Sequence, residues 1–284
     1  MEGIEKCIEK RIEKRYNLRN VQRKRKVGAV LNNYRKIFRE YADVIRGHHV
    51  FLFDLDQTLL DFHASEYKGL KIVVEAEGYE FNDDLYGYFK ARNKELWLEL
   101  EKGTISRTDL FKTRFRLLFE KCGADTAGID LLKTNGEFIS AMAGNGVLMD
   151  GALDFLKKLR ENIRDSRVYI VTNGVQENAE GRVRSTGLDR FIDGMFVSET
   201  LGATKPSAEY FGIVLNTINE RREDCIVIGD SLTSDMLGAK NAGLTSCWFM
   251  PEGDIEKAMM EYDIDYCAAS FDELYDVLER WACR

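Results

Sequence analysis

Short, uninterrupted apolar runs alternate with segments of helical periodicity through much of the chain. Runs of this kind are typical of strands that are buried on both faces of a parallel sheet. They cover residues 50–53, 168–171, 195–197, 225–228 and 246–249. Between them, apolar positions recur at helical spacing, as in 152–159 and 210–218. Strands that alternate with helices predict an α/β fold with a doubly wound parallel sheet.

A long insertion separates the first two runs. More than 100 residues lie between them, which is far more than an ordinary crossover needs. Residues 63–146 have helical periodicity without a convincing strand, and Ser106 followed by Asp109 resembles a helix-starting capping box. We therefore expect a helical cap domain at 63–146, inserted into a core domain made of 49–62 and 147–284.

The first 48 residues differ in composition from the rest of the chain. They hold 14 Lys and Arg against 6 Asp and Glu, a net of +8, whereas the remainder carries −15. Apolar residues at helical spacing around the basic cluster 23–26 predict a helical N-terminal extension over 1–48. In one interpretation it packs on the main domain or on a neighbouring subunit. In the other it contacts nucleic acid, an anionic membrane surface or a protein partner.

The composition indicates a folded cytoplasmic protein. Hydrophobic residues make up 44% of the chain, and there are only two prolines. No apolar stretch reaches the roughly 18 residues that cross a bilayer, and the charged N-terminus is unlike a signal peptide. The six cysteines form no C-x-x-C pair, which is typical of reduced thiols. We expect no membrane partner.

Charged and hydroxyl side chains gather where the predicted strands end. The first strand ends in the pattern D-x-D-x-T, and the fourth ends in Gly-Asp with a further Asp five residues on. Because the carboxyl ends of parallel strands meet at one edge of a sheet, these side chains should converge on one crevice. The converging residues are Asp54, Asp56, Thr172, Asn173, Lys205, Asp230 and Asp235.

The predicted crevice suits phosphoryl groups. Several carboxylates in one crevice repel one another unless a cation offsets their charge. Magnesium prefers a few carboxylates together with water and phosphate oxygens, whereas zinc needs His and Cys spacings that this chain lacks. Lys205 and the Thr172 hydroxyl add donors for phosphate oxygens. The sequence thus predicts magnesium-dependent phosphoryl chemistry.

These motifs resemble the haloacid dehalogenase superfamily, whose phosphatases carry D-x-D-x-T, a strand-end Ser or Thr, a lysine and a G-D-x-x-x-D-type pattern in this order. The resemblance covers about residues 50–275. The stretches that most closely resemble the house-cleaning pyrimidine 5'-nucleotidases are 53–59, 93–97, 170–174 and 238–244. The resemblance implies a cytosolic phosphatase of nucleoside monophosphates with a Rossmann-like core and a helical cap.

The resemblance also implies roles for the strand-end residues. Asp54 would attack phosphorus and form an aspartyl phosphate. Asp56 would protonate the leaving oxygen and later deprotonate the attacking water. Magnesium would be held by the carboxylates of Asp54 and Asp230 and by the main-chain carbonyl of Asp56, while Asp235 would order a coordinated water or Lys205. The phosphate would be bound by Thr172, Asn173 and Lys205.

Side chains of the cap would select the substrate. An aromatic ring such as that of Trp97 can stack on a base, although its alternative place is the core of the cap helices. The candidates for holding a nucleoside are Phe62, Asn93, Trp97 and Arg114. Two other functions stay open. One is a phosphatase of another small metabolite, such as phosphoglycolate or a sugar phosphate, and the other is a binding role for the N-terminal segment. Dehalogenation is disfavoured, because relatives with that activity need no magnesium and generally lack an acid at the position of Asp56.

Overall fold

The structure is a computed structural model that describes residues 49–101, 103–250 and 254–283. The predicted helical extension over residues 1–48 lies outside the described residues. Among the described helices, none combines the length and the apolar character that a membrane span requires.

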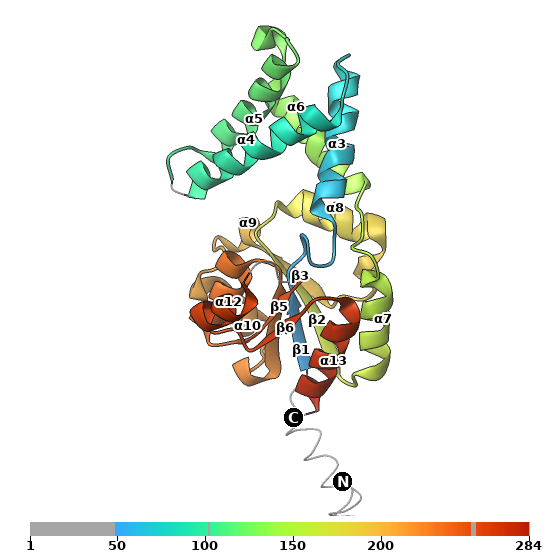
Figure 1. The fold of residues 1–284 in the computed structure, drawn as a ribbon, viewed down its shortest axis with the longest axis vertical. Coiled ribbons are helices and arrows are strands. Elements are labelled where there is room, and N and C mark those ends of the chain that lie inside the picture. Colours follow the sequence, from blue (N-terminus) through green and yellow to red (C-terminus); the bar gives the residue numbers. More distant parts are fainter. Residues whose placement is uncertain (1–48, 102, 251–253, 284) are drawn as a thin grey trace, which may run out of the picture. The chain divides into compact units, whose positions relative to one another are not determined.

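A parallel six-stranded sheet forms the centre of the core (Figure 1). Its strands are β1 His49–Phe53, β2 Ser166–Thr172, β3 Gly194–Val197, β4 Cys225–Gly229, β5 Thr245–Phe249 and β6 Tyr266–Ala268. Their order is β3-β2-β1-β4-β5-β6, which confirms the predicted α/β, doubly wound sheet. The short edge strand β6 was not predicted, because its Tyr-Cys-Ala sequence lacks the Val, Ile, Leu and Phe that mark the other strands.

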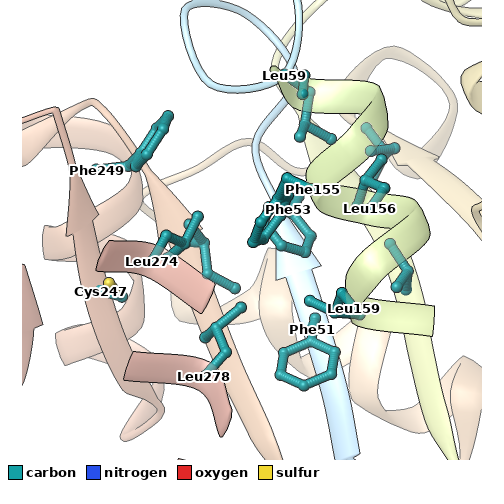
Figure 2. Packing of buried hydrophobic residues seen from close by; sticks show 14 of the residues in the cluster. Phe51, Phe53, Leu59, Phe155, Leu156, Leu159, Cys247, Phe249, Leu274 and Leu278 are labelled. Atoms are coloured by element: carbon teal, nitrogen blue, oxygen red, sulfur yellow. The ribbon is translucent and has the colours of Figure 1, made fainter. Parts of the chain in front are cut away.

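Alternate residues of β1 face opposite layers of the core. Phe51 and Phe53 pack against α7 and α13, as Figure 2 shows. Val50 and Leu52 point the other way and belong to the apolar layer that includes α10. All four side chains are fully buried, so β1 is covered on both faces as its uninterrupted apolar sequence predicted.

Helices surround the sheet and also make up the insertion after β1. The helices of the core are α7 Ala152–Asn162, α8 Gln176–Thr186, α9 Ser198–Leu201, α10 Ala208–Ile218, α11 Leu237–Ala242, α12 Ile255–Tyr262 and α13 Phe271–Ala282. Single turns lie at η1 Thr126–Gly128, η2 Leu188–Arg190, η3 Arg222–Asp224 and η4 Leu232–Met236. The helices between β1 and α7 are α3 Phe62–Ala76, α4 Asp83–Glu101, α5 Arg107–Lys121 and α6 Leu131–Gly144.

Helices α3 to α6, called the helical insert below, have their own apolar core. Phe89, Phe115 and Phe138 meet at its centre with ring centroids 5.5–6.1 Å apart. The capping box predicted at the start of α5 is present, with Ser106 and Asp109 bonding each other's backbone amides. The fold therefore has the inserted helical cap that the sequence predicted, while the residue limits assigned to the two domains stay a prediction.

Two chain segments join the helical insert to the core and lie side by side. The amide of Asp61 donates to the carbonyl of Val147 at 2.9 Å, and the amide of Met149 donates to the carbonyl of Leu59 at 3.0 Å. Gln57 adopts a left-handed backbone conformation, with φ of 59°, and its side-chain oxygen accepts from the amide of Phe62 at 2.8 Å. The loop after β1 thus both carries the strand-end aspartates and caps the first helix of the insert.

Candidate active site

The strand ends and the helical insert enclose one cavity of about 360 Å³. The core contributes residues that directly follow β1, β2 and β4, together with the loop before α10. All the strand-end residues predicted from the sequence line it, namely Asp54, Asp56, Thr172, Asn173, Lys205, Asp230 and Asp235. The topology of the sheet therefore brings together groups that are up to 181 positions apart along the chain.

Lys205 is the centre of the charged network. Its ammonium donates to Asp54 Oδ1 at 2.6 Å, to Asp235 Oδ1 at 2.6 Å and to the carbonyl of Val171 at 2.8 Å. These three acceptors use all the donors of an ammonium group. Because the Lys205 side chain is 1% exposed, removal of the amine would leave buried carboxylates without their partner.

Three carboxylates form a cluster that fits a divalent cation. Oxygen atoms of Asp54, Asp230 and Asp235 lie within 4.8 Å of one another. With the Lys205 ammonium between two of them, the cluster has a formal charge of −2. A hard ion such as Mg²⁺ takes oxygen ligands of this kind and would offset that charge. The cluster includes the Asp235 carboxylate itself, which the sequence had assigned to a supporting position, and it does not include the Asp56 carboxylate.

Burial and mutual repulsion perturb the acids of this cluster. Burial raises the pKa of Asp54 well above its ordinary value; the Lys205 ammonium opposes this rise, and Asp235 adds to it. Burial, followed by repulsion from Asp235, raises the pKa of Asp230 from 3.8 to about 6. For Lys205, burial acts to lower the pKa, but Asp235 and Asp54 outweigh it, so the pKa is raised and the amine stays charged. Such perturbed groups in a cavity are typical of a functional site.

The end of β4 is shaped to admit the Asp235 side chain. A Cβ on Gly229 would lie only 2.3 Å from Asp235 Oδ2, so only glycine leaves room for this approach. The main chain of Asp230 is held from the neighbouring strand, because the indole of Trp248 donates to its carbonyl at 2.8 Å. The carboxylates of this edge are therefore fixed by close packing as well as by charge.

The last residue of β2 and the residue after it differ in what their side chains contact. Thr172 is buried, and its hydroxyl accepts from the amide of Gly174 at 3.1 Å. The Asn173 side chain bonds both to the amide and to the carbonyl of Lys205, each at 2.9 Å. The Asn173 carboxamide thus holds the lysine loop in place and uses both its oxygen and its nitrogen to do so.

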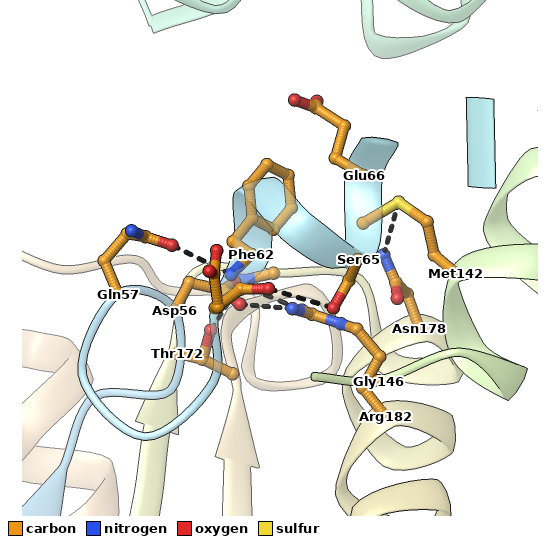
Figure 3. Close-up of polar contacts among 12 residues, drawn as sticks. Asp56, Gln57, Phe62, Ser65, Glu66, Met142, Gly146, Thr172, Asn178 and Arg182 are labelled. Carbon is orange, nitrogen blue, oxygen red and sulfur yellow. Dashed lines mark hydrogen bonds and ion pairs between the residues drawn. The ribbon is translucent and has the colours of Figure 1, made fainter. Parts of the chain in front are cut away.

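Asp56 is held by a residue that the sequence did not single out. Both nitrogens at the tip of Arg182 on α8 bond the Asp56 carboxylate, Nη1 to Oδ1 and, at 3.2 Å, Nη2 to Oδ2 (Figure 3). The Arg182 side chain is 2% exposed and that of Asp56 is 28% exposed. A signal for Arg182 was available, since it shares a helical face with the buried Ala179 and Val183, and an arginine on such a face needs a carboxylate partner.

Aromatic residues of the helical insert form the wall of the cavity opposite the strand ends. Phe62, Trp97 and Phe111 all line it and are only partly buried. The predicted candidate Trp97 does not belong to the buried cluster of the insert, which argues against the alternative that it serves as core. Phe111 was missed because its spacing on α5 matches that of core residues.

Two polar residues of this wall, both predicted, are buried. The Asn93 amide group donates to Glu66 Oε1 at 3.3 Å, while its Oδ1 has no partner among the described residues. The Arg114 guanidinium donates to Asn135 Oδ1 and lies 5.0 Å from the ring centre of Phe138. No carboxylate of the described chain lies within 4.0 Å of Arg114. The wall therefore offers one acceptor without a described partner and one buried cation, on which the Glu66 carboxylate acts without a direct ion pair.

Residues 48–243 match the family model of the haloacid dehalogenase-like hydrolases. The protein YfnB of Bacillus subtilis is 34% identical over 82% of this chain and 97% of its own length. Two relatives are named pyrimidine 5'-nucleotidases. PynA of Streptococcus pneumoniae is 34% identical over 81% of this chain and 94% of its own, and YjjG of Escherichia coli is 31% identical over 71% and 88%.

A solved structure has the same fold. The crystal structure of YfnB from Bacillus subtilis superposes with a TM-score of 0.72 at 32% identity and covers 82% of this chain and 99% of its own. That structure is described as bound to magnesium and as revealing interdomain movement.

Proposed function

The chain belongs to the haloacid dehalogenase-like hydrolases, and from this premise we propose that it is a magnesium-dependent phosphatase that acts through Asp54 on nucleoside 5'-monophosphates with pyrimidine bases. One observation carries the proposal. A buried aspartate, a buried lysine and two further carboxylates meet at 2.6–4.8 Å on one side of a cavity whose other side is aromatic.

The first half of the reaction transfers the phosphoryl group to the protein. An oxygen of the Asp54 carboxylate attacks phosphorus, and the bond between phosphorus and the nucleoside 5'-oxygen breaks. The leaving oxygen takes the proton of the Asp56 carboxyl group and departs as the nucleoside hydroxyl. Lys205, already within 2.6 Å of Asp54, offsets charge on the phosphoryl oxygens when a phosphate oxygen replaces one of its present acceptors.

The second half returns the protein to its starting state. The Asp56 carboxylate accepts a proton from a water molecule as that water attacks phosphorus. The bond between phosphorus and the Asp54 oxygen breaks, inorganic phosphate leaves, and Asp56 is protonated again. Water is the only other reactant consumed, so the step needs neither an oxidant nor a second substrate.

The carboxylate cluster suits magnesium as the cofactor. Asp54, Asp230 and Asp235 are the carboxylates that would hold the ion. The main-chain carbonyl of Asp56 would add a further oxygen ligand of the kind that magnesium prefers. When bound, the ion neutralises the cluster and withdraws charge from phosphate oxygens. Because magnesium takes oxygen ligands, this site requires no histidine or cysteine side chain.

The aromatic wall supports a nucleoside as the leaving group. Trp97 and Phe111 line the cavity and remain partly exposed, as a stacking surface for a base requires. A pyrimidine with a ring N–H offers a donor to Asn93 Oδ1, which lacks a partner in the described chain, and its carbonyl oxygens accept from a cation such as Arg114. A small sugar phosphate would leave these groups unused, and a site with unused buried polar groups discriminates against such a substrate.

The proposal is tested with a panel of phosphate monoesters. Release of inorganic phosphate is measured from UMP, dUMP, dTMP, phosphoglycolate and ribose 5-phosphate, each with Mg²⁺ or with a chelator. We expect magnesium-dependent release that is fastest from the pyrimidine nucleotides. Faster hydrolysis of phosphoglycolate or ribose 5-phosphate would contradict the nucleotide assignment, and hydrolysis that persists in the chelator would contradict the metal assignment.

A further inference from the structure

The side chain of Arg182 hydrogen-bonds only to Asp56 among the described residues. Its two terminal nitrogens bond the two carboxylate oxygens, and its Nε lacks a partner in the same region. The arginine is buried whereas Asp56 reaches the cavity. A buried cation without a counter-charge is strongly unfavourable, so Arg182 stays paired with Asp56. When one Asp56 oxygen carries a proton, the other oxygen still accepts from the guanidinium. The fork of Arg182 therefore fixes the plane of the Asp56 carboxyl group.

The backbone that carries Arg182 is held against the helical insert. A Cβ on Gly181 would come within 2.4 Å of the Ala143 side chain, and a Cβ on Gly146 would come within 2.8 Å of the Arg182 carbonyl. Helix α8 thus packs tightly on α6 and on the segment that leads back to the core. Small residues at these contacts allow the close approach and leave the helix little room to shift.

The side chain of Arg182 also contacts the first residue of the insert. Its guanidinium carbon lies 5.4 Å from the centre of the Phe62 ring, within reach of a cation–π interaction. Figure 3 shows Asp56, Phe62 and Arg182 together beside Gly146, at the point where both joining segments pass. One buried guanidinium therefore touches the proposed acid and the start of the insert.

We propose that Arg182 is a positioning residue that holds the Asp56 carboxyl group toward the leaving oxygen of the substrate. The inference rests on the proposed function, because it presumes that Asp56 delivers a proton. Arg182 itself contacts no reacting atom. Its effect acts through Asp56 and is therefore restricted to the step in which that proton moves.

This role predicts a dependence on the leaving group. The oxygen of a nucleoside is a strong base and leaves only with a proton, whereas 4-nitrophenolate is a weak base and leaves without one. A mispositioned Asp56 therefore slows the transfer from UMP and spares the transfer from 4-nitrophenyl phosphate. Since kcat/KM includes steps only up to departure of the leaving group, it isolates this half of the reaction.

The experiment compares kcat/KM for UMP and 4-nitrophenyl phosphate in the full-length protein with Mg²⁺. For Arg182→Met we expect a loss of about 100-fold with UMP and of no more than about threefold with 4-nitrophenyl phosphate, within the range that general acid catalysis supplies. Arg182→Lys keeps the charge but not the fork, and should lose about tenfold with UMP alone. Arg184→Met is the matched control, because Arg184 lies on the same helix with its side chain 67% exposed, and both rates should be unchanged.

A double-mutant cycle separates positioning from a structural effect. With Asp56→Asn already present, adding Arg182→Met should change the UMP rate by less than about twofold, since the group it positions is gone. Equal losses on both substrates in Arg182→Met and in Arg182→Lys, or additive losses in the double variant, would overturn the proposal. If Arg182→Met does not fold, the test is the loss of kcat/KM in Arg182→Lys with UMP relative to its loss with 4-nitrophenyl phosphate. A wild-type protein that hydrolyses neither ester would instead reject the proposed function itself.

Discussion

The two sides of the cavity are built in different ways. The strand-end side is a charged network in which each group is held by another, as Lys205 is by Asp54 and Asp235 at 2.6 Å. The side formed by the helical insert consists of aromatic surfaces with a few buried polar groups, of which Asn93 Oδ1 has no described partner. Among the described residues, the lysine of the first side has a partner for every donor, whereas the second side has a buried acceptor without one.

This difference predicts which substitutions should slow hydrolysis of every substrate and which should slow hydrolysis of only some. Removal of Lys205 leaves buried carboxylates without their counter-charge, so the rate should fall to a similar extent for every substrate. Removal of an aromatic ring from the other side deletes a surface that only a ring-containing substrate would use. Substitutions on the two sides can therefore be told apart by the pattern of substrates they affect.

Among the substitutions that keep the proposed nucleophile, the largest effect is expected from Lys205→Met. The change removes the charge that offsets Asp54, Asp235 and the phosphoryl oxygens, and should lower kcat/KM by about 1,000-fold or more for UMP and acetyl phosphate alike. Lys257→Met, at an exposed position on α12, is the control and should leave both rates unchanged. A Lys205→Met loss confined to UMP would break the distinction between the two sides.

The next largest effect is expected on the stability of the protein as pH and Mg²⁺ concentration change. The pKa of Asp230 is raised from 3.8 to about 6, so between these pH values the folded protein holds more protons than the unfolded one. Its stability without metal therefore falls as pH rises through this window. Mg²⁺ reverses this loss at pH 7 to 8, contributing about 2.7 kcal/mol at 100 times its Kd, and should stabilise little below pH 5.

Thermal unfolding with and without Mg²⁺ measures this dependence. Asp230→Asn should raise the Tm of the metal-free protein at pH 7 and abolish the rise in Tm that Mg²⁺ causes. Asp263→Asn, which changes an acid at the end of α12, should respond to Mg²⁺ like the wild type. An equal Mg²⁺ response at pH 5 and pH 8 would contradict the assignment of Asp230.

A smaller and selective effect is expected from Trp97→Ala. Loss of stacking on a base costs about 1–3 kcal/mol, so kcat/KM for UMP should fall about 10- to 100-fold while that for acetyl phosphate changes little. Leu98→Ala provides the control, because Leu98 is the next residue on the helix and is 45% exposed. Equal losses for both substrates would place Trp97 among structural residues.

The smallest effect is expected where the helical insert touches the core through a surface ion pair. Arg107 on α5 lies 3.2 Å from Glu199 on α9, and both side chains are about one-third exposed. Such pairs contribute about 0–1 kcal/mol, so Arg107→Met should change kcat/KM for UMP by less than about fivefold. A much larger loss in steady-state assays would show that this contact controls access to the cavity.

The sequence predicted the strand-end side of the cavity well, because a buried parallel strand must end at a known edge of the sheet. Asp54 directly follows Phe53, which is fully buried, and the topology of parallel strands leaves such a residue only one edge to occupy. The contacts that these residues make with one another could not be predicted from the sequence. Lys205 contacts Asp54, which lies 151 positions away in the sequence. No local sequence pattern indicates which carboxylates bind the Lys205 ammonium.

The helical side was predicted only in outline. Periodicity marked the helices but could not tell the core-facing Phe115 from the cavity-lining Phe111, because both lie on the apolar side of α5. Arg182 and Arg184 are two residues apart, yet their side chains are 2% and 67% exposed. Only the packing of α8 against α6 distinguishes them.

The central claim is that Asp54 is the nucleophile of a magnesium-dependent phosphatase. Its most direct test is the rate of phosphate release from UMP by the wild-type protein and by Asp54→Asn, each with Mg²⁺ and with a chelator. We expect release by the wild type only with Mg²⁺, and a rate at least about 10⁴-fold lower in Asp54→Asn. An Asp54→Asn protein within about tenfold of the wild-type rate would contradict the account.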